Sequence, residues 1–210
     1  MSDLVIAIDG PAGSGKSTVA RAVAARLGWS FLDTGAMYRA VTWDALHHGI
    51  DVHDTAAVAA LAADVRLTTL PRVTVNGHDV EDEIRSDEVN SAVSVVAANP
   101  EVRASMVERQ REFAAAQLLG TVVEGRDITT VVFPHASVKI FLTASLEERA
   151  RRRGGDEGEA SVARRDEADS TRLASPLRQA EDALVLDTTG RDVEDVAREI
   201  VQWLNRNLSS

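Results

Sequence analysis

Residues 10–17 read Gly-Pro-Ala-Gly-Ser-Gly-Lys-Ser and match the pattern G-x-x-x-x-G-K-[ST] at every fixed position. In such a loop the backbone N–H groups surround phosphate oxygens, the lysine reaches the β- and γ-phosphates, and the last hydroxyl helps to hold Mg²⁺. The flanks fit, because an apolar run at 4–8 predicts a strand and apolar residues at helical spacing predict a helix capped by Gly28. The alternative, a tight turn with a surface lysine, is disfavoured by the complete motif. We therefore expect a nucleoside triphosphate to bind to Gly10, Pro11, Ala12, Gly13, Ser14, Gly15, Lys16, Ser17 and Thr18.

The composition restricts the remaining possibilities. A chain of 210 residues with 44% hydrophobic residues can bury a substantial core, and we expect one domain with an insertion. No run approaches the roughly 18 apolar residues of a membrane span, and the acidic residues Asp3 and Asp9 beside the first strand argue against a secretory signal. The absence of cysteine excludes disulfides and thiolate chemistry. A net charge of −10 argues against general nucleic-acid binding.

Strand and helix patterns alternate along most of the chain. Such alternation predicts an α/β fold with a parallel sheet covered by helices on both faces. Between the second helix and a long helical segment, an Asn76-Gly77 turn predicts a small antiparallel hairpin, which interrupts the alternation as an insertion would. The expected strands are 4–8, 29–33, 121–124, 138–142 and 183–186, with hairpin strands at 65–70, 72–75 and 78–80. The expected helices follow residue 15 and cover 35–48, 83–119 with a break near Asn99-Pro100, 146–153 and 193–208.

A phosphate loop alone does not identify a reaction, because GTPases, ATP-driven machines and small-molecule kinases all contain one. A GTPase would need an Asn-Lys-x-Asp segment, and the only lysines are Lys16 and Lys139, neither of which lies in such a segment. Larger ATPases usually need a longer chain. We therefore expect a compact kinase with a second site for a phosphoryl acceptor.

The first candidate for that acceptor site is Phe-Leu-Asp-Thr-Gly-Ala-Met-Tyr-Arg at 31–39. We expect Thr34 to cap the helix that starts here, and Tyr38 and Arg39 to lie on its first turns near the carboxyl edge of the sheet, where ligands bind. A helix N-terminus with an arginine can hold a monophosphate. From these residues alone, an ordinary capped helix with a buried tyrosine and a solvated arginine is an equally good interpretation.

The second candidate is Val-Val-Glu-Gly-Arg-Asp at 122–127, at the end of a predicted central strand. Glu124 can hold Mg²⁺ through water, Gly125 permits close backbone approach, and Arg126 and Asp127 would face the same cleft. The alternative is a turn with a surface ion pair.

Together with Glu-Ile-Arg-Ser-Asp-Glu-Val at 83–89 and Arg-Arg-Asp-Glu-Ala-Asp-Ser-Thr-Arg at 164–172, these motifs closely resemble the bacterial cytidylate kinases, from about residue 4 to residue 204. The resemblance implies a P-loop kinase core with a five-stranded parallel sheet, an inserted monophosphate-binding subdomain at about 61–107 and a short lid at about 149–172. It also implies transfer of the γ-phosphoryl group of ATP to CMP or dCMP with Mg²⁺. The expected protein is a cytoplasmic monomer that binds neither nucleic acid nor membranes.

The resemblance assigns roles to individual residues. The acceptor phosphate is expected to contact Thr34, Arg39, Arg126 and Arg172, the cytosine edge Ser94, Arg103 and Asp127, and the sugar Tyr38, Arg165 and Asp169, with Gly125 also in the CMP site. Lys16, Arg126 and Arg172 are expected to act in catalysis by neutralising charge, and an already ionised phosphate acceptor needs no general base. Cytosine fits this assignment, because its amine can donate to Asp127 while Arg103 and Ser94 donate to its acceptor atoms.

The segment Gly-Gly-Asp-Glu-Gly-Glu at 154–159 is shorter and more acidic than in many family members. Candidates for triphosphate contacts near it are Arg149 and Arg153, with Arg151 and Arg152 beside them, although a solvated basic helix face would look the same. Two other functions stay open at this point. One is a kinase for uridylate, adenylate or a small alcohol, and the other is a nucleotide-gated binding protein that has lost phosphoryl transfer.

Overall fold

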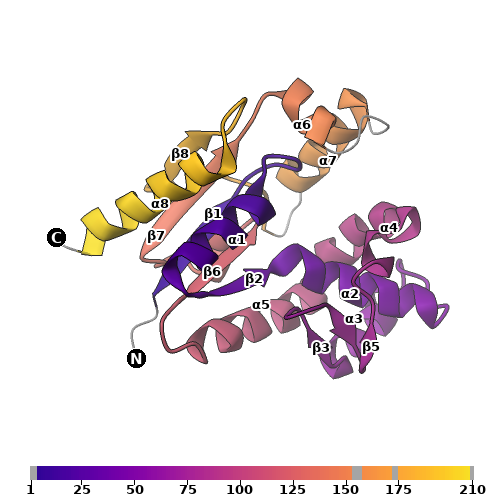
Figure 1. The fold of residues 1–210 in the computed structure, drawn as a ribbon. Helices are drawn as coiled ribbons and strands as arrows, with labels where there is room; N and C mark the ends of the chain where they lie inside the picture. The colour runs from indigo at the N-terminus through magenta and orange to yellow at the C-terminus, as the bar shows by residue number, and fades with distance from the viewer. Residues whose placement is uncertain (1–3, 153–157, 172–174, 209–210) are drawn as a thin grey trace. The chain divides into compact units, whose positions relative to one another are not determined.

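A five-stranded sheet with β1 (Val5–Asp9) at its centre organises the first part of the fold. The computed structural model describes residues 4–152, 158–171 and 175–208 (Figure 1). The order of the strands is β2-β6-β1-β7-β8, and β1 pairs in parallel with both β6 and β7, as β7 does with β8. The other strands of this sheet are β2 (Ser30–Asp33), β6 (Thr121–Gly125), β7 (Val138–Thr143) and β8 (Leu184–Asp187).

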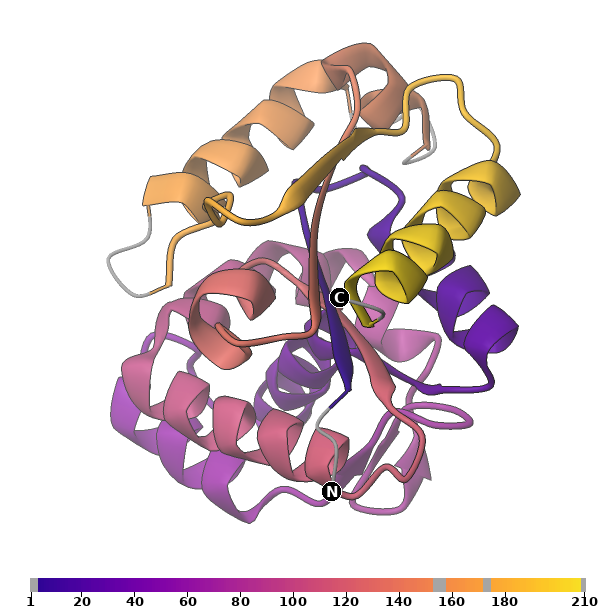
Figure 2. The same cartoon turned by 90° about the vertical axis from the view of Figure 1, so that its left-hand side faces the viewer.

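The chain divides into two compact units, of which the first combines 1–32 with 111–210. Its helices α1 (Lys16–Leu27) and α8 (Val193–Leu208) lie on the same face of the sheet (Figure 2). The buried positions of α8 recur at helical spacing, at Val196, Ile200 and Leu204, because only one stripe of this helix faces the sheet. The unit also contains the π-helical turn η2 (Ile128–Val132) and the helices α6 (Leu146–Arg152) and α7 (Glu159–Thr171).

The second unit, 33–110, contains a small antiparallel sheet in the order β3-β4-β5. Its β4–β5 turn has positive φ at both Asn76 and Gly77, as the Asn-Gly pair predicts. Around the sheet are helices whose bounds are α2 (Thr34–His47), α3 (Thr55–Asp64), η1 (Glu83–Arg85) and α4 (Asp87–Ala98), and α5 (Pro100–Ala115) continues into the first unit. The strands of the small sheet are β3 (Leu67–Thr68), β4 (Thr74–Val75) and β5 (His78–Asp79).

The predicted fold class, a five-stranded parallel sheet with helices and a separate small antiparallel sheet, is confirmed. Gly28 ends α1 in the left-handed conformation, and the helical segment after residue 83 breaks at Asn99, both as predicted. One local prediction is wrong: the side chain that caps α2 belongs to Asp33, which accepts from the Ala36 N–H at 2.9 Å, and Thr34 is the first helical residue. The proposed limits of the insertion and of the lid stay predictions. Among the described residues, every helix is too short or too polar to cross a bilayer.

Gly120 permits a close approach just before β6. Its φ is 140°, and a Cβ here would lie 2.7 Å from the Trp29 ring and 2.9 Å from the Leu4 carbonyl oxygen. We expect Gly120→Ala to lower the free energy of unfolding by about 3 kcal/mol through backbone strain and overpacking. Gly28→Ala is the control: it meets nothing within 4 Å, so only its left-handed backbone is penalised, by about 1 kcal/mol. Chemical denaturation measures both, and equal losses would contradict the packing role of Gly120.

Candidate functional site

The predicted phosphate loop connects β1 to α1, and two of its glycines, Gly10 and Gly13, have no room for side chains. Gly10, Gly13 and Gly15 have φ of 153°, 77° and 85°. A Cβ at Gly10 would lie 2.1 Å from the Leu142 carbonyl oxygen, and one at Gly13 would lie 2.7 Å from the Arg149 carbonyl oxygen. Larger residues would therefore force the loop away from β7 and α6, and the N–H groups of the loop would lose their arrangement around one centre.

Two side chains at the start of α1 carry the functional groups of the motif. The Lys16 side chain is buried, and its Nζ donates to the Pro11 carbonyl oxygen at 2.8 Å. Ser17 Oγ donates to Glu124 Oε1 at 2.6 Å, which brings together the two residues predicted to act at the metal. A hydroxyl and a carboxylate supply the oxygen ligands that Mg²⁺ prefers, so this pair can hold the ion directly or through water.

The end of β6 lies against the start of the phosphate loop. Gly125 pairs in register with Asp9, and Arg126 Nη1 donates to the Gly10 carbonyl oxygen at 3.1 Å. Asp127 follows and is 5% exposed. Two residues predicted to act on the acceptor therefore lie beside the loop predicted to bind the donor.

Asp9 is a further residue of this site, and its role is not predicted from the sequence. Its carboxylate is fully buried and accepts from the Ile128 N–H at 2.9 Å, the Thr129 N–H at 2.7 Å and Thr129 Oγ1 at 2.6 Å. The pKa of Asp9 is raised to about 6, chiefly by burial and to a smaller extent by the charge of Asp127, while the three hydrogen bonds act to lower it. Its position directly before the glycine-rich loop is the one available sequence signal.

The second unit holds the other predicted acceptor residues that the structure describes. The Arg103 guanidinium is buried and lies over the Tyr38 ring, 5.5 Å from its centroid, and its Nη1 donates to the Ala97 carbonyl oxygen at 3.3 Å. Arg39 Nη1 donates to the Ile84 carbonyl oxygen at 3.1 Å and to Asn90 Oδ1 at 2.8 Å. The other predicted acceptor residues of this unit are Thr34 and Tyr38, both buried on α2, and Ser94, which is half-buried on α4.

Arg149 connects the phosphate loop to α7. Its guanidinium is buried and donates to the carbonyl oxygens of Ala144 and Ala12, at 3.1 and 3.2 Å, and pairs with Asp166. It therefore supports the loop from the protein side, and its predicted contact with the triphosphate stays a prediction. Arg153 and Arg172 lie outside the described residues, as do the side chains of Arg165 and Asp169 on α7.

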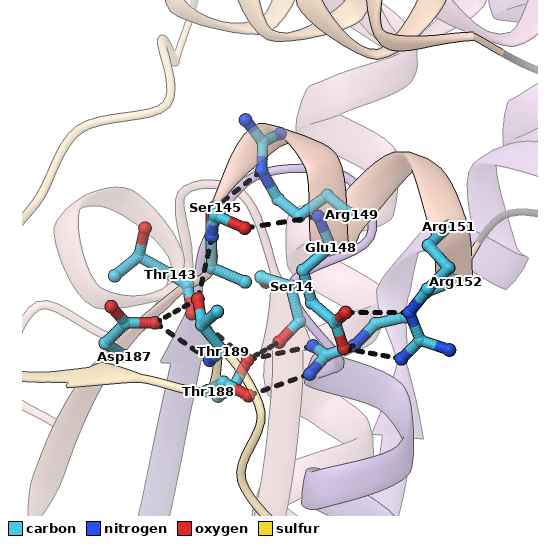
Figure 3. Close-up of polar contacts among 11 residues, drawn as sticks. Ser14, Thr143, Ser145, Glu148, Arg149, Arg151, Arg152, Asp187, Thr188 and Thr189 are labelled. Atoms are coloured by element: carbon cyan, nitrogen blue, oxygen red, sulfur yellow. Dashed lines mark hydrogen bonds and ion pairs between the residues drawn. The ribbon is translucent and has the colours of Figure 1, made fainter.

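Thr188, which follows β8, forms a second support of the phosphate loop (Figure 3). Its Oγ1 donates to the Ser14 carbonyl oxygen at 3.0 Å, and Arg152 donates to both its hydroxyl and its carbonyl oxygen, at 2.9 and 2.8 Å. Glu148 accepts from Arg151 and Arg152, and these hydrogen bonds hold the pKa of the carboxyl at about 2. Neither Thr188 nor Glu148 is predicted from the sequence, although the run Asp-Thr-Thr-Gly at 187–190 after the last strand is a signal.

A complete phosphate loop at the carboxyl end of the central strand of a parallel sheet places the chain in the class of P-loop nucleotide-binding proteins. Comparison with known proteins defines the group within that class. The chain belongs to the cytidylate kinase family, whose model matches residues 6–206. Curated cytidylate kinases from Geobacillus kaustophilus and Streptomyces avermitilis are each 48% identical, over 97% and 94% of this chain and 97% and 91% of their own lengths.

Other relatives are longer. A bifunctional pantoate ligase/cytidylate kinase from Trichormus variabilis is 48% identical over 98% of this chain, which spans only 42% of that relative's length. Among solved structures, a gluconokinase from Sinorhizobium meliloti and a shikimate kinase from Acinetobacter baumannii align with TM-scores of 0.54 and 0.53 at 17% and 18% identity. These alignments cover 97% of this chain and 93% and 94% of the two structures, and they support the fold alone.

The raised pKa of Asp9 predicts a pH-dependent stability. Because the folded protein binds the Asp9 proton more tightly than the unfolded chain does, this group stabilises the fold most at low pH and loses that contribution as the pH rises through about 6. Relative to Asp9→Asn, the unfolding free energy of the wild type should fall by on the order of 3 kcal/mol between about pH 4 and about pH 7. Urea denaturation at several pH values measures the difference, and a constant difference would contradict the perturbed pKa.

Proposed function

We propose that this chain acts as a cytidylate kinase, which transfers the γ-phosphoryl group of ATP to CMP or dCMP and yields ADP with CDP or dCDP. The single observation that carries the proposal is the hydrogen bond from Arg126 to the carbonyl oxygen of Gly10. It sets a residue of the proposed acceptor site against the loop that binds the donor. A protein that used ATP only as a switch would have no need of acceptor residues there.

The donor would be held by the phosphate loop and Lys16, and a magnesium ion by Ser17 and Glu124, whose 2.6 Å contact supports a common metal site. The ion, when bound, neutralises charge on the β- and γ-phosphates. Lys16 would lie along the same phosphates once it releases the Pro11 carbonyl oxygen. Because the acceptor phosphate is already ionised, the protein needs only to align the two substrates and offset their charge, and Arg126 and Arg172 are the proposed groups.

The base would be selected by its hydrogen-bonding edge. Asp127 accepts from the exocyclic amine of cytosine in this proposal, and Arg103 and Ser94 donate to the ring acceptors. Uracil has a carbonyl in place of that amine, which would set a second acceptor against the buried carboxylate of Asp127. Sites that depend on such a bond can reject the wrong ligand by large factors. Thr34, Arg39, Tyr38, Arg165 and Asp169 complete the proposed contacts to phosphate and sugar.

The remaining expectations follow from the family resemblance. Arg149 and Arg153 as triphosphate ligands, a cytoplasmic location and a monomeric state stay predictions. Kinases of small alcohols share the fold, but the similarity to them is too low to carry an acceptor over.

Lys16→Met tests the donor site. We expect kcat/KM for CMP phosphorylation to fall at least about 100-fold, because the charge that binds the β- and γ-phosphates is lost. Lys139→Met is a matched control, since Lys139 is the other lysine of the chain and pairs with the exposed Asp182. Coupled measurement of ADP release should show near-normal activity for the control, and a similar effect of both substitutions would count against the assigned role of Lys16.

Asp127→Ala tests base selection. We expect the preference for CMP over UMP to fall by at least about 100-fold, chiefly through loss of CMP turnover, while ATP binding is kept. Asp182→Ala, which removes an exposed carboxylate, is the control. Rates with each nucleotide and an ATP titration by calorimetry give the comparison, and an unchanged CMP to UMP ratio would remove Asp127 from base reading.

A further inference from the structure

The carboxylate of Asp9 organises a segment about 120 positions away in the sequence. It accepts hydrogen bonds from the N–H groups of Ile128 and Thr129 and from the Thr129 hydroxyl, at 2.6 to 2.9 Å. Asp9 is 0% exposed and Thr129 is 1% exposed, so water does not compete for these bonds. A buried carboxylate is costly unless hydrogen-bonded, and an apolar residue at the end of β1 would continue the buried strand without that cost. The presence of a carboxylate at this buried position is therefore explained by its hydrogen bonds to Ile128 and Thr129.

The residues that precede this segment, Gly125 and Arg126, are also held in place. Gly125 lies in the ladder opposite Asp9, and Arg126 donates to the carbonyl oxygen of Gly10. In the sequence, Asp127 lies between Gly125 and Arg126, which make these two contacts, and Ile128 and Thr129, whose amides donate to Asp9. Its own carbonyl oxygen accepts from the N–H groups of Val131 and Val132, at 2.8 and 3.2 Å. The backbone of Asp127, at φ −141° and ψ 23°, is thus held on both sides, and this fixes the direction in which its Cα–Cβ bond leaves the chain.

We propose that Asp9 is a positioning residue, whose hydrogen bonds to Ile128 and Thr129 hold Arg126 and Asp127 in the orientation that binds the acceptor nucleotide beside the phosphate loop. The inference rests on the proposed function of those two residues. Asp9 itself touches neither substrate, because it is fully buried. The two N–H groups and the hydroxyl that Asp9 accepts from favour the ionised form of its carboxyl.

The test uses three variants of the whole chain. Asp9→Asn keeps the shape but turns an amide NH₂ toward donors. Thr129→Val removes only the hydroxyl donor, and Thr129→Ser keeps it and is the matched control. We expect KM for CMP to rise at least about tenfold in Asp9→Asn, with a loss of preference for CMP over UMP, and to rise less in Thr129→Val. The Kd for ATP should change less than about threefold, and Thr129→Ser should behave as the wild type.

A second readout does not depend on turnover. Hydrogen exchange measured by NMR should show the Ile128 and Thr129 amides protected in the wild type, and at least about tenfold less protected in Asp9→Asn.

If the wild type phosphorylates CMP but Asp9→Asn and Thr129→Val keep its KM for CMP and its base preference, the inference is wrong. Equal losses in ATP and CMP binding would also overturn it, because they would indicate general damage to the loop. If Asp9→Asn does not fold, Thr129→Val decides alone. Absence of CMP turnover in the wild type would reject the proposed function, and the exchange data would still show whether Asp9 holds the segment.

Discussion

The parallel pairing of β1 with β6 is the constraint on which the rest of the site depends. It sets Asp9 opposite Gly125, so that the residues following each strand leave the sheet side by side. The chain after β1 turns into the phosphate loop, and the chain after β6 carries Arg126 and Asp127. A one-residue change of register would move Glu124 away from Ser17 and Arg126 away from Gly10. The pairing of β1 with β6 therefore brings the phosphate loop and the segment that carries Arg126 and Asp127 together.

The polar contacts around the loop explain how a glycine-rich segment keeps one shape. Gly10 and Gly13 fit tightly against β7 and α6, and loop carbonyl oxygens are bonded by Lys16, Arg149 and Thr188. Arg149 contacts Ala12 and Asp166 with one guanidinium, which couples the loop to α7. These three hydrogen bonds hold the backbone of the loop at Pro11, Ala12 and Ser14. In the proposed function, such a fixed loop would supply the electrostatic preorganisation that phosphoryl transfer requires.

Patterns that are local in sequence predict most of the fold and locate the glycine-rich loop between β1 and α1. The phosphate loop, the strands of the large sheet, the Asn76-Gly77 turn and the Gly28 cap depend on a few adjacent residues, and periodicity or turn chemistry reveals them.

Periodicity misses α3, because its alanine-rich sequence is apolar on every face, although the helix propensity of alanine and the cap at Asp54 would have indicated it. The mixed charges of α7 conceal that helix for the opposite reason, since it lacks an apolar stripe. The sequence pattern predicts the cap of α2 one residue too late, at Thr34 instead of Asp33, because threonine and aspartate have similar cap preferences. The role of Asp9 depends on partners some 120 residues away, which no local pattern contains.

A competition experiment on the purified wild-type chain decides whether the protein is a kinase that reads cytosine. ATP and Mg²⁺ are mixed with equal concentrations of CMP, dCMP, UMP, GMP and shikimate, and mass spectrometry identifies every phosphorylated product. Because the acceptors compete in one tube, the product ratios report their relative kcat/KM values. We expect CDP and dCDP as the main products, with little UDP and no GDP or phosphorylated alcohol. Comparable amounts of UDP or GDP would contradict the proposed reading of cytosine, and ATP binding without any transfer would contradict the assignment as a kinase.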